Sequence, residues 1–128
     1  SIFVKKNRKD MKTLVLGAST KPYRYAYLAA KSLLAHQHEI VLIGKSSGEV
    51  GGVSIHTTMV KAEGVDTVTM YLRPEHQKEY YHYIMQLAPR RIIFNPGTEN
   101  NELARLAQQQ GVLTEEACTL VLLNSGQY

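Results

Sequence analysis

The residues best suited to chemistry follow the first apolar segment, where Leu16 is succeeded by a Gly-Ala-Ser-Thr turn. A glycine lets the backbone turn sharply, and small side chains let a ligand approach the main chain. A helix that starts after such a turn points free N–H groups at an anion. Arg24 falls in the first turn of that expected helix, where a cation opposes the helix dipole unless an anion compensates. We therefore predict a phosphate-binding turn made of Gly17, Ala18, Ser19 and Thr20, with Arg24 beside it.

The hydroxyl groups of this turn have a second expected use. Ser19 and Thr20 are residue types that cap helices, so we expect them to cap the helix that follows. Gly17 is the one glycine of the turn, which therefore falls short of the full dinucleotide-binding fingerprint.

A second candidate turn follows the apolar segment Glu39–Ile43, which ends at Gly44-Lys45. An NAD site places a carboxylate at this point to bind the ribose 2′-hydroxyl, but the first acid here is Glu49. A lysine can instead bind a phosphorylated ribose. Lys45 is therefore a candidate phosphate-binding residue, and the turn favours NADP or coenzyme A over NAD.

Two later turns complete the candidate site. The first, at residues 71–74, is expected to border an adenine ring with apolar atoms. The second, at residues 95–99, contains Gly97, which permits close approach of a ligand, and has Thr98 as the expected helix cap. Polar atoms facing the ligand are expected from Asn95 and Glu99. The candidate residues of these two turns are Leu72, Arg73, Pro74, Asn95, Pro96 and Gly97.

Catalytic motifs are not found in the sequence, which contains no HExxH, no Gly-x-Ser-x-Gly elbow and no lysine P-loop. Four histidines lack metal-ligand spacing and are expected on the surface: His36, His38, His76 and His82. The tyrosines at positions 80, 81 and 83 are expected to pack or to form an interface. The single cysteine, Cys118, has no obvious basic partner and is expected to be a buried thiol.

The turns are positioned by strands that alternate with helices along the chain. This order predicts an α/β fold, a Rossmann-like doubly wound sandwich with a mostly parallel sheet, whose ligands bind at the carboxyl ends of the strands. Expected strands lie at 12–16, 39–43, 53–56, 65–72, 91–94 and 112–113, with a glycine-rich loop at 44–52. Expected helices lie at 23–36, 74–87 and 99–110. Residues 57–64 are a short helix or a loop, and residues 118–123 are a final strand or a packed tail.

Composition places the 128 residues in one domain. Residues 1–10 contribute +3 of the net charge of +4, so the remainder carries only +1. We interpret residues 1–10 as an N-terminal extension or an expression remnant, followed by a domain at 11–128. The domain lacks the basic stripe of nucleic-acid binders. No apolar run approaches the roughly 20 residues that span a membrane, and no signal peptide is apparent. One cysteine favours a cytoplasmic location.

The chain resembles the small single-domain CoA-binding proteins, which are similar to the CoA-binding domain of the succinyl-CoA synthetase α-subunit. The resemblance covers about residues 12–123. It rests on Gly17-Ala18-Ser19 with Arg24 downstream, on Val65-Asp66 leading toward Pro74, on the segment 95–100, and on Cys118. It implies a Rossmann-like fold and coenzyme A or an acyl-CoA as the ligand.

The same resemblance implies a role for each turn. The pyrophosphate would lie on residues 17–20 near Arg24, and Lys45 would meet the ribose phosphate. Residues 72–74 would border the adenine, and Pro96 and Gly97 the pantetheine. The turn after Ile43 departs from the Val-Asn-Pro-like turn usual in the family. The phosphohistidine and nucleotide-grasp domains of the synthetases have no counterpart here, so ligase activity is not implied.

Three functions remain open on the sequence. The first is a CoA-binding module without catalysis, with a small-molecule nucleotide ligand as its partner. The second is an NADP-dependent oxidoreductase, although the one Tyr-x-x-x-Lys match, Tyr27 to Lys31, lies on the first helix rather than a later one. The third is a nucleotide-sensing interaction domain that uses the tyrosine-rich helix to form a homodimer.

Overall fold

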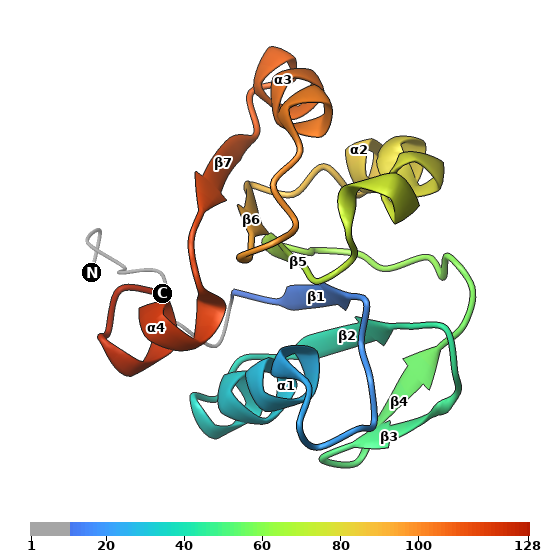
Figure 1. Cartoon of the computed structure of the whole chain (residues 1–128), viewed down its shortest axis with the longest axis vertical. Coiled ribbons are helices and arrows are strands. Elements are labelled where there is room, and N and C mark those ends of the chain that lie inside the picture. The colour runs from blue at the N-terminus through green and yellow to red at the C-terminus, as the bar shows by residue number, and fades with distance from the viewer. Residues whose placement is uncertain (1–10) are drawn as a thin grey trace.

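The computed structural model describes residues 11–128, and the predicted extension at residues 1–10 lies outside this range. The described residues form a seven-stranded sheet of order β3-β4-β2-β1-β5-β6-β7 (Figure 1). The pairs are parallel except β3 with β4, so the mostly parallel α/β fold is confirmed. The strands are β1 (Thr13–Leu16), β2 (Ile40–Ile43), β3 (Gly48–Val50), β4 (Val53–His56), β5 (Thr67–Met70), β6 (Arg91–Phe94) and β7 (Leu113–Glu116).

Strand β1 lies at the point where the strand order reverses, with β2 on one side and β5 on the other. It pairs with both strands, and Leu16 lies level with Ile43 and Met70. The chain therefore leaves these three strands at the same edge of the sheet. Ligands of doubly wound sheets bind at such a switch point.

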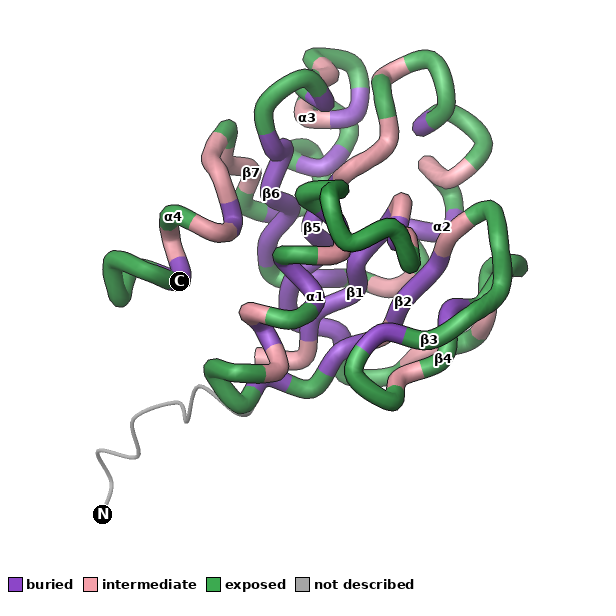
Figure 2. The backbone as a smooth tube through the Cα atoms, turned by 60° about the horizontal axis from the view of Figure 1, so that its bottom comes forward, coloured by how far each residue is buried: buried purple, intermediate pink, exposed green. Residues whose placement is uncertain are grey.

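Helices cover both faces of the sheet, with α1 (Tyr25–Ala35) and α4 (Thr119–Asn124) on one face (Figure 1). The other face is covered by α2 (Tyr81–Leu87) and α3 (Asn101–Gln109). Side chains along β1 point alternately to the two faces of the sheet. Leu14 and Leu16 pack under α2 and α3, and Val15 packs under α1. Strands β1, β5 and β6 are accordingly buried along their length (Figure 2).

The sequence of α1 explains why it lies close to the sheet. Its buried residues, Ala26, Ala29, Ala30 and Leu33, follow the spacing of one helix face. Three of them are alanines, so the helix backbone can approach the strands. This close packing fixes where the helix begins relative to the turn after β1.

The segment expected as one helix from Pro74 to Leu87 is divided, which corrects the prediction. It begins with two 3-10 turns, Pro74–His76 and Lys78–Tyr80, and only then becomes α2. The helix ends at Leu87, and its C-cap residue, Ala88, adopts a left-handed conformation. The next residue is Pro89, and a proline disfavours the helical conformation in the residue before it.

Other boundaries differ where short segments depend on distant partners. The glycine-rich loop contains β3, which forms a hairpin with β4. Residues 57–64 hold no helix, and residues 119–124 form α4 rather than a final strand. Asn100, not Thr98, caps α3, with its side chain accepting a hydrogen bond from the Leu103 N–H at 3.1 Å.

Within residues 11–128, none of the helices has the length and apolar character of a membrane-spanning segment.

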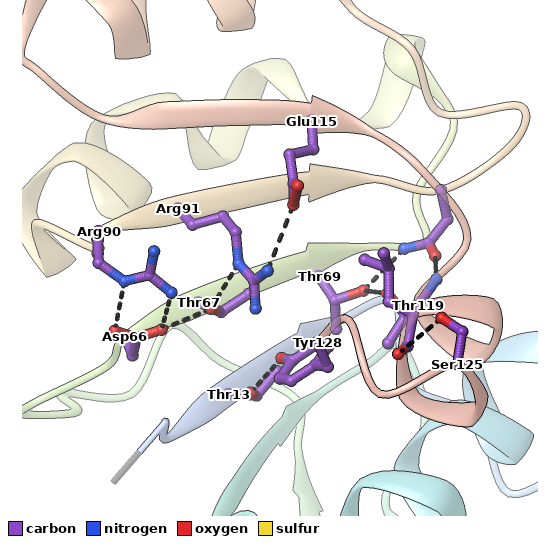
Figure 3. A network of polar contacts seen from close by, with 12 residues as sticks. Thr13, Asp66, Thr67, Thr69, Arg90, Arg91, Glu115, Thr119, Ser125 and Tyr128 are labelled. Carbon is purple, nitrogen blue, oxygen red and sulfur yellow. Dashed lines mark hydrogen bonds and ion pairs between the residues drawn. The ribbon is translucent and has the colours of Figure 1, made fainter. Parts of the chain in front are cut away.

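A polar network ties the amino ends of the central strands to the end of the chain (Figure 3). Arg90 binds buried Asp66 with two hydrogen bonds, of 2.9 and 3.1 Å. Arg91 donates to Thr67 at 3.1 Å, and its guanidinium lies 4.5 Å from the centre of the Tyr128 ring. The Tyr128 hydroxyl hydrogen-bonds to that of Thr13. This network holds the segment after α4 against the sheet.

Candidate functional site

A cavity of about 400 Å³ lies at the carboxyl edge of the sheet, beside the switch point. Three turns line it, those that follow β1, β2 and β5. Its lining residues are Gly17, Ala18, Ser19, Thr20, Lys21, Arg24, Lys45, Ser46, Tyr71, Leu72, Arg73 and His76. The fold thus brings together three of the four turns that the sequence singled out.

Eight of the twelve candidate residues line this cavity: Gly17, Ala18, Ser19, Thr20, Arg24, Lys45, Leu72 and Arg73. The other four, Pro74, Asn95, Pro96 and Gly97, are not part of its lining. Pro74 starts the 3-10 turn that follows Arg73. The remaining three belong to the turn after β6, which lies next to β5 on the side away from β1.

The first turn is fixed by the main chain of its neighbours. The N–H groups of Gly17 and Ala18 both donate to the Ile43 carbonyl, at 2.9 and 2.8 Å. Gly17 has a φ of +100°, and a Cβ there would lie 3.0 Å from the carbonyl carbon of Tyr71. Glycine therefore has both a conformational and a steric reason to occupy this position. The backbone donors of Gly17 and Ala18 are engaged within the protein.

The predicted capping of α1 is wrong. Arg24 occupies the N-cap position, and the described residues supply no side-chain cap and no acid in the first helical turn. The Ser19 hydroxyl instead accepts a hydrogen bond from the Lys21 N–H at 3.1 Å. The start of α1 thus keeps its positive dipole end without an internal anion, which suits a bound anion.

The segment from Gly44 to the start of β3 is packed against the first turn through glycines. A Cβ at Gly44 would lie 2.3 Å from the Ala18 carbonyl oxygen, and one at Gly48 would lie 2.5 Å from Cγ2 of Thr20. Lys45 and Ser46, which line the cavity, stand between these two contacts. The glycines of the loop therefore set the distance between the first and second turns.

We expect the variant Gly48→Ala to weaken ligand binding through Thr20. The new methyl group would displace the Thr20 side chain, and the φ of +151° at Gly48 adds backbone strain. The expected cost in binding is about 1 kcal/mol, measured by calorimetric titration with coenzyme A. The double variant Gly48→Ala/Thr20→Ser removes the clashing Cγ2 atom and keeps the hydroxyl, so it should regain much of the affinity. Equal affinity of the single and double variants would refute a role for this contact.

Positive charge dominates the cavity. Four cationic side chains line it, Lys21, Arg24, Lys45 and Arg73, together with His76, and none of the described lining residues is acidic. Arg73 has a carboxylate neighbour outside the lining, Glu75, at 3.8 Å, and both side chains are largely exposed. Such a cluster repels itself unless anions neutralise it, so the arrangement suits a ligand with several phosphates.

Four lining residues were not among the candidates: Lys21, Ser46, Tyr71 and His76. Tyr71 lies within the predicted turn at residues 71–74, and Lys21 and Ser46 directly follow the candidate residues Thr20 and Lys45 in the chain. Burial raises the pKa of the Tyr71 hydroxyl, which therefore stays protonated. His76 is exposed, as expected, but it was not predicted to adjoin the site, since the 3-10 turn that carries it was read as a regular helix.

Of the other histidine and tyrosine predictions, the one for His38 is wrong and the one for Tyr83 is confirmed. His38 is buried, contrary to expectation, and its ring lies 4.9 Å from that of Tyr128. Tyr83 packs in the core, and its hydroxyl donates to the Val60 carbonyl, as expected of a packing residue. Cys118 is a free, partly buried thiol.

A second hollow, of about 600 Å³, lies near the amino ends of β5 and β6. Its lining is formed by residues of the 59–64 segment and of α2, and includes Lys61, Glu63 and Tyr83. It contains one basic side chain and lacks the glycine turn. Among residues 11–128 no cluster of His, Cys, Asp and Glu side chains could hold a metal ion. The cavity at the switch point is therefore the candidate site.

Comparisons with known structures support the fold. A solved structure titled as an uncharacterized protein is 47% identical, with a TM-score of 0.90, and the match covers 92% of this chain and 98% of that one. A hypothetical protein from Pyrococcus horikoshii OT3 is 22% identical, with a TM-score of 0.82 over 90% and 82% of the two chains. A Thermus thermophilus structure is 15% identical, with a TM-score of 0.79 over 91% and 90%.

The last two likenesses show the fold alone, and the chain matches no curated protein. At the level of families, the CoA binding domain matches residues 11–124, which is nearly all of the described chain. The chain therefore belongs to the CoA-binding domain family.

Proposed function

We propose that the protein binds coenzyme A or a CoA thioester in the cavity at the switch point, without catalysing a reaction of its own. The observation that carries the proposal is the charge of the lining, in which four cationic side chains surround the cavity beside the glycine turn. Charge-assisted hydrogen bonds to phosphate are the strong interactions that such a lining supplies. A binding role needs no further group in the site.

The charge also bears on which nucleotide is bound. Coenzyme A carries a pyrophosphate and a phosphate on its ribose, whereas NAD carries the pyrophosphate alone. Lys45 lies at the end of β2, where an NAD site has a carboxylate. NADP shares the ribose phosphate with coenzyme A, so it is the competing ligand, and family membership favours coenzyme A.

Each side of the cavity has a proposed role. Arg24 and the hydroxyls of Ser19 and Thr20 bind the pyrophosphate, since the N–H groups of Gly17 and Ala18 are engaged with Ile43. Lys45 binds the ribose phosphate, and the side chain of Leu72 borders the adenine. We also propose a cytoplasmic location, because the only cysteine, Cys118, is a free thiol.

Calorimetric titration with coenzyme A, NADP and NAD tests the proposal. We expect micromolar binding of coenzyme A and no binding of NAD. Preferential binding of NADP would favour the oxidoreductase alternative, and absence of binding by all three would refute a nucleotide site. A coupled thiol-release assay with acetyl-CoA tests for hydrolysis, and turnover in it would refute a purely binding role.

The variants Arg24→Ala and Lys45→Ala should each weaken coenzyme A binding by roughly 1–3 kcal/mol, because each removes a charge-assisted bond to phosphate. The matched control is Lys61→Ala, which removes an exposed lysine of the second hollow and should leave affinity unchanged. If both site variants bind as tightly as the unaltered protein, the phosphate assignment is wrong.

A further inference from the structure

We infer that the cavity recognises only the 3′-phosphorylated nucleotide head of coenzyme A and leaves the acyl end outside, so that free coenzyme A and its thioesters bind alike. The inference rests on the proposed function and adds the ligand class to it. It follows from which turns line the cavity and from what closes the side next to β6.

The lining ends at the turn after β5. All twelve lining residues come from the turns after β1, β2 and β5 and the segments that continue them. The turn after β6, which the sequence assigned to the pantetheine arm through Pro96 and Gly97, contributes none. The cationic and hydroxyl side chains of the lining therefore lie on the turns after β1, β2 and β5.

The side chain of Gln77 closes the space between the turns after β5 and β6. It is 0% exposed, and its Nε2 donates to the carbonyls of Leu72 and Thr98, at 2.8 Å each. Its Oε1 accepts a hydrogen bond of 2.9 Å from Asn100. Because both ends of the amide are bonded, an arm of the ligand would have to break this bridge to pass between the two turns.

The polar groups of the turn after β6 are also used within the protein. Asn95 is 2% exposed, and its Nδ2 donates to Thr69 Oγ1 at 2.7 Å and to the Met70 carbonyl at 2.9 Å. Its Oδ1 accepts from the Thr119 N–H at 2.9 Å. The Gly97 N–H donates to Glu99 at 2.9 Å. Asn95 thus joins β5, β6 and α4, and it is a structural residue rather than one that faces a ligand.

The charged and uncharged parts of coenzyme A match the polar cavity and the closed side next to β6. The head of coenzyme A carries all of its phosphates, and the pantetheine arm is uncharged with two amides. The cavity offers cations and hydroxyls to the head. Between the turns after β5 and β6, the arm would meet the amide of Gln77 and the carbonyls of Leu72 and Met70, all of which are already hydrogen-bonded. Binding free energy is therefore expected from the head, and the acyl group stays in solvent.

The test is calorimetric titration with five probes. Coenzyme A, acetyl-CoA and malonyl-CoA share the head and differ in the acyl group, so their Kd values should agree within about threefold. The head without the arm, 3′-phosphoadenosine 5′-phosphate, should bind within about tenfold of coenzyme A, since it lacks one phosphate. The arm without the nucleoside, 4′-phosphopantetheine, should bind at least about 100-fold more weakly.

Two variants extend the test. Arg24→Ala should weaken every nucleotide-containing probe by a similar factor. Pro96→Ala, an exposed position in the turn assigned to pantetheine, should leave all Kd values unchanged. A loss of acetyl-CoA binding in Pro96→Ala would refute the inference.

Different results would refute the head-group inference and the proposed CoA-binding function. If coenzyme A binds but 3′-phosphoadenosine 5′-phosphate does not, or if the acyl group changes Kd by more than about tenfold, the inference is wrong and the CoA-binding function stands. If the head fragment binds and coenzyme A does not, the proposed function fails. If no probe binds, both fail.

Discussion

The variant Gly44→Ala is expected to lose coenzyme A binding and to destabilise the fold. A methyl group there would lie 2.3 Å from the Ala18 carbonyl oxygen, which is backbone and cannot rotate away. The first and second turns would have to separate, and both line the cavity. Overpacking of this kind costs roughly 3 kcal/mol in the free energy of unfolding. Urea denaturation and calorimetric titration measure the two effects.

The matched control for this prediction is Gly52→Ala, in the hairpin of β3 and β4 that follows Gly44. Gly52 has a φ of +83°, and no described atom lies within 4 Å of its added Cβ. Its substitution should cost about 1 kcal/mol of backbone strain and leave coenzyme A affinity unchanged. If the two variants bind coenzyme A equally well, the contact between Gly44 and Ala18 does not position the site.

The variant Tyr128→Ala is expected to lower the free energy of unfolding by about 3–5 kcal/mol, the usual range for deleting a buried aromatic ring. Tyr128 is buried in the core cluster beneath α1 and α4. Its ring lies 4.9 Å from that of His38 and 4.5 Å from the Arg91 guanidinium. Without it, a buried arginine loses a cation–π partner and Thr13 loses a hydrogen bond. Urea denaturation measures the loss.

The conservative variant Tyr128→Phe separates the contributions of the ring and the hydroxyl. It keeps the ring contacts with His38 and Arg91 and removes the hydroxyl that bonds to Thr13, so it should cost about 1 kcal/mol. Coenzyme A binding by folded Tyr128→Phe should be unchanged, because Tyr128 does not line the cavity. Equal stabilities of the alanine and phenylalanine variants would show that the ring contacts contribute little.

Local signals predicted much of the fold. The strand at Arg91–Phe94 was predicted with its observed bounds, since it is a short buried run between turn residues. The helix expected at 23–36 is α1, because alanines and Leu33 repeat at helical spacing. These elements carry their pattern within a few residues of chain. The elements that were missed, β3 and α4, are short and lack such a pattern.

The candidate site was predicted in part for a related reason. Alternation of strands with helices places the carboxyl ends of parallel strands at one edge, so the turns at Gly17, Lys45 and Leu72 could be expected to meet. The turn at Asn95 follows the same rule, and it does lie at that edge. It contributes no residue to the cavity lining, and the buried Gln77 side chain bridges the carbonyls of Leu72 and Thr98 between the two turns.

The sequence by itself determined the α/β architecture, the position of the glycine turn after β1 and the resemblance to the CoA-binding family, because periodicity, turn residues and motif order are properties of neighbouring residues. Only the tertiary structure decided which turns share a cavity, and that His38 and Tyr128 are buried together. The hydrogen bond between Tyr128 and Thr13 joins residues 115 positions apart. Contacts at such separation are set by how the layers pack, and no local pattern encodes them.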